Sequence, residues 1–166
     1  MDLVRKLCIS LLLCLEQLKD SENDLYFVFS VQEEVGCRGA SILGYNIRPD
    51  LCVAVDIGSS FDEPGDKVRT IKLGGGPSIG VKDNNLYDLI AIREVEDAAR
   101  RIGAKVQYEI SSGGTDAGVI QRAPGGVPSV AFSIPLRGIH TPCEIYNCDD
   151  VKTLAAVLAD LAVNSK

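Results

Sequence analysis

Four short apolar runs alternate with segments of helical periodicity along this chain, and no other sequence feature limits the fold as strongly. The runs lie at residues 25–31, 52–57, 105–110 and 129–135. The first, LYFVFSV, is aromatic and β-branched without polar alternation, which is typical of a strand covered on both faces. Strands that alternate with helices form a right-handed, mostly parallel sheet with helices on both faces. The sequence therefore predicts an α/β fold.

The helical segments complete this pattern. Leucines recur at helical spacing through residues 2–19 and give that helix a broad apolar face that would cover the sheet. Further helices are predicted at residues 38–46, 86–102 and 149–163, and Gly103 is expected to end the second of these.

The loops carry the remaining signals of organisation. Residues 58–67 and 111–128 are long, polar and rich in Gly and Pro, and loops of that length are usually functional or mobile. No linker or internal repeat divides the 166 residues, so one domain over residues 1–166 is predicted.

The composition excludes some classes of binding partner and indicates where the protein is located. With 17 Lys plus Arg against 23 Asp plus Glu, the net charge is −6, which excludes binding of the nucleic-acid backbone through bulk charge. No apolar run approaches the roughly 20 residues that span a bilayer, and residues 7–15 lack the cleavage site of a signal peptide. The six cysteines form no C-x-x-C pair. We expect a cytoplasmic protein with reduced thiols and neither nucleic-acid nor membrane partners.

Acidic residues and the one histidine follow the predicted strands. Glu33 and Glu34 come after the first run, Asp56 closes the second, and His140 comes after the last. Functional groups of parallel α/β sheets collect at the carboxyl ends of the strands. Carboxylate and imidazole groups are ligands that Zn²⁺, Co²⁺ or Mn²⁺ accept, and Glu33 would then serve as a general base. This set favours a metal-dependent hydrolase.

Each of these residues also has an ordinary structural interpretation. A single histidine is often a surface or hydrogen-bonded residue, and adjacent glutamates often begin a solvated helix. Asp56 would equally cap the turn after its strand, and Asp116 in the GGTDAG segment would equally cap a helix. The residue types alone leave both interpretations open.

A serine hydrolase is a further alternative. The segment GPSIG at residues 76–80 matches the G-x-S-x-G nucleophile elbow, and Ser78, Asp116 and His140 follow one another in a known hydrolase order. However, the elbow needs a helix directly after the serine, whereas residues 81–85 read as a loop.

Four ordered segments carry a resemblance to a known family. VFSVQEEVGCRGA, AVDIG with DEPGD behind it, GGTDAG and RGIHTPCE resemble the glutamyl aminopeptidase and cellulase-M-like family of co-catalytic metallo-aminopeptidases, from about Arg5 to the C-terminus. The resemblance implies the fold of di-metal aminopeptidases, peptide substrates and two bridged metal ions, usually Zn²⁺ or Co²⁺. It implies that Glu33 is the general base, that Glu34 and His140 ligate one metal, and that Asp56 ligates the other.

The GGTDAG segment has its own role in this comparison. The resemblance implies that Gly114, Thr115 and Asp116 form part of the pocket wall that holds the first side chain of a peptide substrate.

The resemblance also implies parts that this sequence lacks. Family members have an upstream histidine ligand, an inserted apical domain and a bridging aspartate, and the bridging position aligns with Leu3, one residue from Asp2. A leucine cannot ligate a metal, and two cations without a bridge repel each other, so at most one weakly bound metal is expected. The domain over residues 1–166 is then a partial, carboxy-terminal catalytic domain without the apical domain, with weak or no activity by itself.

Partners follow from the same comparison. Without those parts, an edge of the predicted sheet and the apolar face of the helix at residues 2–19 are less covered. Such surfaces favour self-association or binding of a partner chain, so a homo-oligomer or hetero-oligomer is expected. The main alternative function is a catalytically silent subunit or regulator that pairs with a full-length paralogue.

Overall fold

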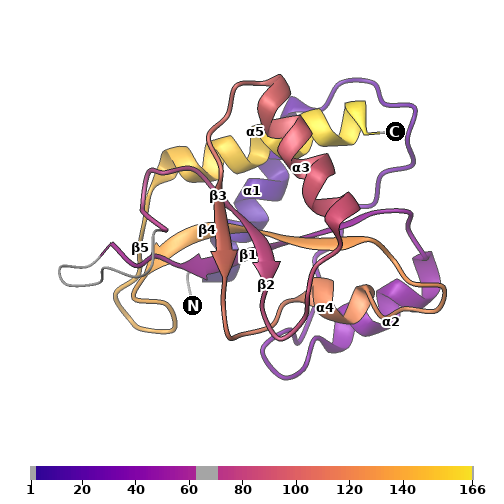
Figure 1. Ribbon diagram of the computed structural model, residues 1–166, viewed down its shortest axis with the longest axis horizontal. Helices are drawn as coiled ribbons and strands as arrows, with labels where there is room; N and C mark the ends of the chain where they lie inside the picture. The colour runs from indigo at the N-terminus through magenta and orange to yellow at the C-terminus, as the bar shows by residue number, and fades with distance from the viewer. Residues whose placement is uncertain (1–2, 63–70, 166) are drawn as a thin grey trace.

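The fold is a sheet between two layers of helices (Figure 1). The computed structural model describes residues 3–62 and 71–165. The elements are α1 (Leu3–Gln17), α2 (Arg38–Ile47), β1 (Cys52–Ser59), β2 (Ser78–Lys82), α3 (Leu89–Arg101), β3 (Gln107–Ile110), α4 (Asp116–Ile120), β4 (Ser129–Arg137), β5 (Ile145–Tyr146) and α5 (Cys148–Asn164).

The strands form a sheet of order β1-β4-β2-β3, with β5 paired to β4. β1 pairs with β4 in parallel along its whole length, from Cys52 opposite Ser129 to Ser59 opposite Leu136. β2 and β3 are also parallel, while β2 meets β4 over a short antiparallel stretch. The mostly parallel α/β class predicted from the sequence is confirmed.

Helices cover both faces of this sheet. α1, α3 and α5 lie on one face, and α2 and α4 lie on the other (Figure 1). The core is centred on β4, where residues 129–136 are all buried, and on α5, where Leu154 and Val157 are fully buried. Gly103 has a positive φ of 67° directly after α3, as expected for a residue that ends a helix. Among the residues described, no helix has the length and apolar character needed to cross a membrane.

The predicted strand at residues 25–31 is wrong. This segment forms no strand, and Tyr26 and Val31 expose 63% and 66% of their surface. A strand with apolar residues on both sides needs neighbours to pair with and cover it, and the described chain supplies none at this position.

Three predicted loops also need correction. The predicted loop that includes residues 81–85 begins inside β2, a five-residue strand whose serine and glycine give little strand signal. The loop at 111–128 contains the short helix α4. The loop at 58–67 begins later than predicted, because β1 continues to Ser59, and its residues 63–67 lie outside the described part.

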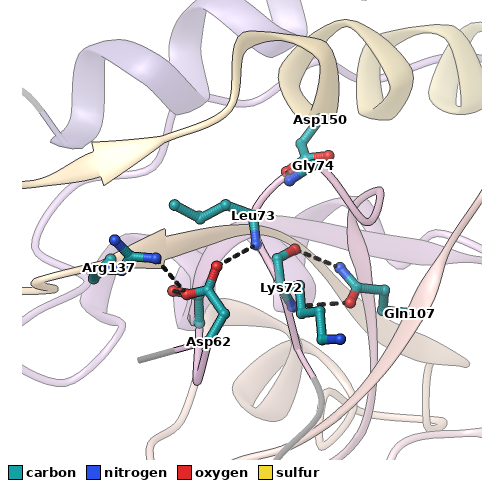
Figure 2. Close-up of polar contacts among 8 residues, drawn as sticks. Asp62, Lys72, Leu73, Gly74, Gln107, Arg137 and Asp150 are labelled. Carbon is teal, nitrogen blue, oxygen red and sulfur yellow. Dashed lines mark hydrogen bonds and ion pairs between the residues drawn. The ribbon is translucent and has the colours of Figure 1, made fainter. Parts of the chain in front are cut away.

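Side chains, not strand pairing, hold the segment that precedes β2. Asp62 accepts hydrogen bonds from Arg137 Nη2 at 2.9 Å and from the Leu73 N–H at 3.3 Å (Figure 2). Gln107 binds the backbone of Lys72 through both its amide atoms, each at 3.0 Å. These contacts fix Lys72 and Leu73 between the ends of β1, β4 and β3, and Ile71 is held by a backbone bond from the Phe61 N–H at 2.9 Å.

Asp150 fixes the next part of the same segment. Its carboxylate, 2% exposed at the start of α5, accepts from the N–H groups of Gly74 at 2.8 Å and Gly76 at 2.9 Å. A buried carboxylate that satisfies two backbone donors replaces the strand partners that this tight turn lacks. Asp150 therefore orients the loop that leads into β2.

Candidate functional site

A tight turn places the two adjacent glutamates before α2. The Glu33 carbonyl accepts from the N–H groups of Gly36 at 3.0 Å and Cys37 at 2.9 Å. Cys37 caps α2 in the left-handed conformation, with φ 51°. The glutamates therefore lie in a folded turn and do not begin a solvated helix, the structural alternative considered from the sequence.

Glu34 and His140 come together from opposite ends of the chain. The distance from His140 Nδ1 to Glu34 Oε1 is 3.6 Å, and the side chains are 61% and 65% exposed. Two ligands that each lie about 2.0–2.2 Å from one Zn²⁺ are separated by roughly 3–4 Å in tetrahedral geometry. This pair therefore has the donor types and the spacing to share a cation, and its exposure leaves room for further ligands.

Asp56 lies inside β1, within electrostatic reach of Glu33 and Asp116. Its Oδ1 accepts from the N–H of Ile57 at 2.8 Å. Burial raises the pKa of Asp56 to about 7, the Ile57 N–H opposes that rise, and the negative charges of Glu33, Asp116 and Glu109 add to it. The carboxylate thus bonds within its own strand instead of capping the next turn, and a cation beside it would favour its charged form.

Glu33 sits between these groups. Burial raises its pKa, the negative charges of Glu34 and Asp116 raise it further, and the Cys37 thiol and His140 lower it. The Cys37 Sγ donates to Glu33 Oε1 at 3.8 Å. A carboxylate with a raised pKa accepts a proton more readily at neutral pH, which suits a general base.

The GGTDAG segment approaches the same place from the start of α4. Thr115 caps α4 by accepting from the Ala117 N–H at 3.3 Å, so Thr115 and not Asp116 is the N-cap. Asp116 Oδ2 accepts instead from the Ser30 hydroxyl at 2.5 Å, while its Oδ1 is buried and has no hydrogen-bond partner in the described chain. Gly114 is exposed beside them.

A hydrogen-bond chain behind Thr115 holds this segment. Tyr87 donates its one hydroxyl proton to Asp83, and Thr115 lies 2.9 Å from the Tyr87 oxygen. Because Tyr87 has no second proton, Thr115 must be the donor, which leaves its lone pairs for the Ala117 N–H. The side chain of Thr115 is therefore fixed in one orientation.

The structure adds Cys37 to the candidate site. Ligand atoms of Glu33, Cys37 and Asp116 lie within 4.8 Å of one another, a group of potential metal donors found among the described residues. Burial raises the pKa of the Cys37 thiol to about 12, and the nearby carboxylates add to that rise. The protonated thiol is a hydrogen-bond donor to Glu33, a role that the sequence prediction of reduced thiols did not include.

Unusual backbone conformations gather at this site. Gln32, Cys37 and His140 have φ values of 60°, 51° and 60°, and Arg48 is the other non-glycine residue with positive φ in the described chain. Such conformations cost energy and persist where the surrounding structure imposes them, often near functional groups.

Ser78 does not belong to this site. It is fully buried at the start of β2, and its hydroxyl donates to Glu109 Oε2 at 2.8 Å. A nucleophile elbow needs an exposed serine between a strand and a helix. The serine-hydrolase alternative is therefore wrong.

The Glu109 carboxyl gives the fold a pH dependence. It is 6% exposed, burial raises its pKa, and bonds from Ser78 and the Ser59 N–H oppose that rise. A raised folded-state pKa means that the carboxyl stabilises the fold below its ordinary pKa and that this contribution is lost as pH rises. Because its amide does not ionise, Glu109→Gln is expected to lose less stability than the original protein as the pH is raised from 5 to 8.

Urea denaturation at both pH values measures this difference. Glu16→Gln, at an exposed position of α1, is the control and should show no such trend. An equal pH trend in the two variants would contradict the role of Glu109.

A large hollow opens directly from the site. Its volume is about 1910 Å³, and its walls include β1, the segment at residues 24–31, and the site residues Glu33, Asp56 and His140. The candidate site is thus one end of a much larger open space.

Comparisons with known proteins agree with this geometry. The family model described as M42 glutamyl aminopeptidase matches residues 5–157. A putative aminopeptidase of Acetivibrio thermocellus is 39% identical over 155 residues, which is 92% of this chain and 47% of that protein. The chain therefore spans about half the length of this relative.

Solved structures give the same result. The aminopeptidase from the archaeon Desulfurococcus kamchatkensis has a TM-score of 0.92 and 30% identity, over 97% of this chain and 47% of that chain. The Pyrococcus horikoshii TET1 peptidase, which can assemble into a tetrahedron or a large octahedral shell, has a TM-score of 0.69 and 32% identity. That match covers 82% of this chain and 40% of the TET1 chain.

Proposed function

Because this chain belongs to the M42 glutamyl aminopeptidase family, we propose that it supplies half of the active site of a metal-dependent aminopeptidase. Such an enzyme hydrolyses N-terminal residues from peptides. The observation that carries this proposal is the 3.6 Å approach of Glu34 and His140 next to Glu33. The family predicted from the four sequence segments is confirmed.

The residues divide into a base and metal ligands. Glu34 and His140 would hold one divalent cation, Zn²⁺ or Co²⁺, and Asp56 would contribute to a second. A bound cation supplies positive charge that lowers the pKa of water and polarises a scissile carbonyl. Glu33 takes the proton from the attacking water and passes it to the leaving amine, and the Cys37 thiol orients Glu33 for both transfers.

The GGTDAG segment would contact the substrate. Gly114, Thr115 and Asp116 lie at the rim of the hollow. Thr115 is fixed by Tyr87, and Asp116 keeps one buried oxygen without a hydrogen-bond partner in the described chain. These contacts support the assignment of the segment to the substrate-binding wall.

The chain by itself is proposed to have weak or no activity and to bind at most one metal weakly. It aligns with 47% of the Acetivibrio protein, and the hollow beside its site is open. The same openness supports the alternative of a catalytically silent subunit that pairs with a longer paralogue. Because the TET1 neighbour assembles into shells, we also propose an oligomer, with a cytoplasmic location.

Metal binding tests the proposed site directly. The purified chain, dialysed against trace Zn²⁺ and analysed for its metal content, is expected to retain Zn²⁺, and His140→Ala should weaken that binding at least about tenfold. Glu34→Ala should act in the same direction, whereas Glu16→Ala on α1 should have no effect.

Two outcomes would contradict the assignment. If His140→Ala retained Zn²⁺ and Asp116→Ala lost it, the metal would bind to the group of Glu33, Cys37 and Asp116 instead. If neither the original protein nor any variant contained metal, this chain by itself would have no metal-dependent activity.

A further inference from the structure

We infer that Tyr87 is a positioning residue for substrate binding: the buried carboxylate of Asp83 holds it, and it in turn fixes Thr115 in the substrate-binding wall. The substrate role rests on the proposed function, but the hydrogen bonds that carry the inference do not. Three observations carry it: a buried carboxylate that holds the Tyr87 hydroxyl, the single acceptor that this hydroxyl offers to Thr115, and the support that the turn between β2 and α3 gives to the wall.

The first observation is the buried carboxylate of Asp83. This residue directly follows β2 and is 3% exposed. Its Oδ1 accepts from the backbone N–H and the side-chain amide of Asn85, and its Oδ2 accepts from the Tyr87 hydroxyl. A carboxylate that has lost its water needs such donors, so these bonds are strongly favoured. The Tyr87 hydroxyl is therefore bound on one side to a fixed acceptor.

The second observation is the state of the Tyr87 hydroxyl. Tyr87 is 4% exposed, and its ring packs so closely on Gly80 that a Cβ there would lie 2.9 Å from the ring. Burial raises the pKa of Tyr87, and the bond to Asp83 raises it further, so the hydroxyl keeps its proton. Because that proton goes to Asp83, the Tyr87 oxygen offers Thr115, 2.9 Å away, only an acceptor. A rigid, buried ring thus determines where the Thr115 hydroxyl points.

The third observation is the turn between β2 and α3, which supports the wall from behind. The Asn84 N–H donates to the Gly113 carbonyl at 2.9 Å, at the start of the wall. Beyond the end of α4, the Arg122 guanidinium donates to Asn85 Oδ1 at 2.6 Å. The turn thus binds the chain on both sides of α4 and its cap, and Tyr87 binds the cap itself.

Tyr87 acts on the substrate only through Thr115. Thr115 lines the hollow, whereas neither Tyr87 nor Asp83 lines it. The two partners of the Tyr87 hydroxyl are Asp83 and Thr115, and neither is the proposed base or a proposed metal ligand. Loss of the hydroxyl is therefore expected to loosen the wall and weaken substrate binding, while the groups that activate water keep their places.

Steady-state kinetics test this separation. The chain is co-expressed with its complementary half, the part of the Acetivibrio thermocellus relative that it does not match, and assayed with Co²⁺ and an aminoacyl amide. Tyr87→Phe removes one hydroxyl and keeps the ring. It is expected to raise KM about fivefold to tenfold and to change kcat by less than about twofold, which is the result of losing binding that substrate and transition state share.

A double-mutant cycle tests whether Tyr87 acts through Thr115. Thr115→Val keeps the shape of the side chain and removes its hydroxyl, so it should also raise KM. In that background Tyr87→Phe should raise KM by less than about twofold, because the bond it removes is already absent. Tyr108→Phe is the matched control: the Tyr108 hydroxyl on β3 bonds Glu96, outside this network, and its loss should leave KM unchanged.

Amide exchange in the ¹⁵N-labelled 166-residue chain tests the same hydrogen bonds without metal or substrate. The Ala117 N–H donates to Thr115 Oγ1, so its exchange reports how firmly Thr115 is held. Tyr87→Phe should speed this exchange at least about tenfold, and Tyr108→Phe should not. Unchanged slow exchange at Phe132, in the centre of the sheet, verifies that both variants remain folded.

Three results would overturn the inference: an unchanged KM in Tyr87→Phe, a fall in kcat as large as the rise in KM, or fully additive effects of Tyr87→Phe and Thr115→Val. Failure of the proposed function looks different. In that case the original assembled protein hydrolyses no aminoacyl amide, and the substrate role of Tyr87 falls with it. The exchange of Ala117 still shows whether Tyr87 holds Thr115.

Discussion

Glu33→Gln is expected to lower the rate of N-terminal residue hydrolysis by about 10²- to 10⁴-fold, the loss that follows removal of a general base. The measurement uses the chain assembled with its complementary half and Co²⁺, with an aminoacyl amide as substrate. Glutamine keeps the shape of the side chain and can still accept the hydrogen bond from the Cys37 thiol. It cannot take up a proton, so the variant removes the function of the base and leaves the packing of the turn unchanged.

Two controls accompany this variant. Metal content should stay unchanged in Glu33→Gln, because Glu34 and His140 are proposed as the ligands. Glu16→Gln, exposed on α1, should retain full activity. A Glu33→Gln rate within a few-fold of the original would show that another group takes the proton, with Asp116 as the nearest carboxylate candidate in the cluster.

Gly76→Ala is expected to destabilise the fold by about 3–5 kcal/mol, from the combined cost of overpacking and a strained backbone. Gly76 has φ 96°, and a Cβ at this position would lie 2.0 Å from the carbonyl oxygen of Lys105. That oxygen belongs to the backbone and cannot turn aside. Since small domains are stable by only about 5–15 kcal/mol, this loss would unfold a large part of the protein at moderate urea concentrations.

Gly125→Ala separates the two costs. Gly125 has the same φ of 96°, but no heavy atom lies within 4 Å of the point where an alanine Cβ would stand. This variant therefore reports the conformational cost by itself, and urea denaturation of both gives the steric part as a difference. Equal losses for the two variants would show that the Lys105 carbonyl moves away at no cost.

The candidate site was only partly visible in the sequence. His140 could be singled out because functional groups collect after strands, and the family resemblance gave roles to Glu33, Glu34, Asp56 and His140. Glu33 and Glu34 follow a predicted strand that does not form, and Asp56 lies inside β1 and not at its end. The approach of Glu34 to His140, 106 positions later in the chain, could not be seen, because it depends on how β4 and the turn before α2 pack. Cys37 was missed because a cysteine four residues after a glutamate has no signal of its own.

The sequence by itself determined the α/β class, the family and the order of the helices, since periodicity and short motifs are local properties of the chain. It also determined that residues 25–31 have the composition of an interior strand. The tertiary structure decided that this segment stays unpaired, because a strand exists only where a neighbour offers backbone partners. It likewise decided that Ser78 is a buried donor to Glu109 and that Thr115 is the cap of α4, since burial and hydrogen-bond partners arise from contacts between distant parts of the chain.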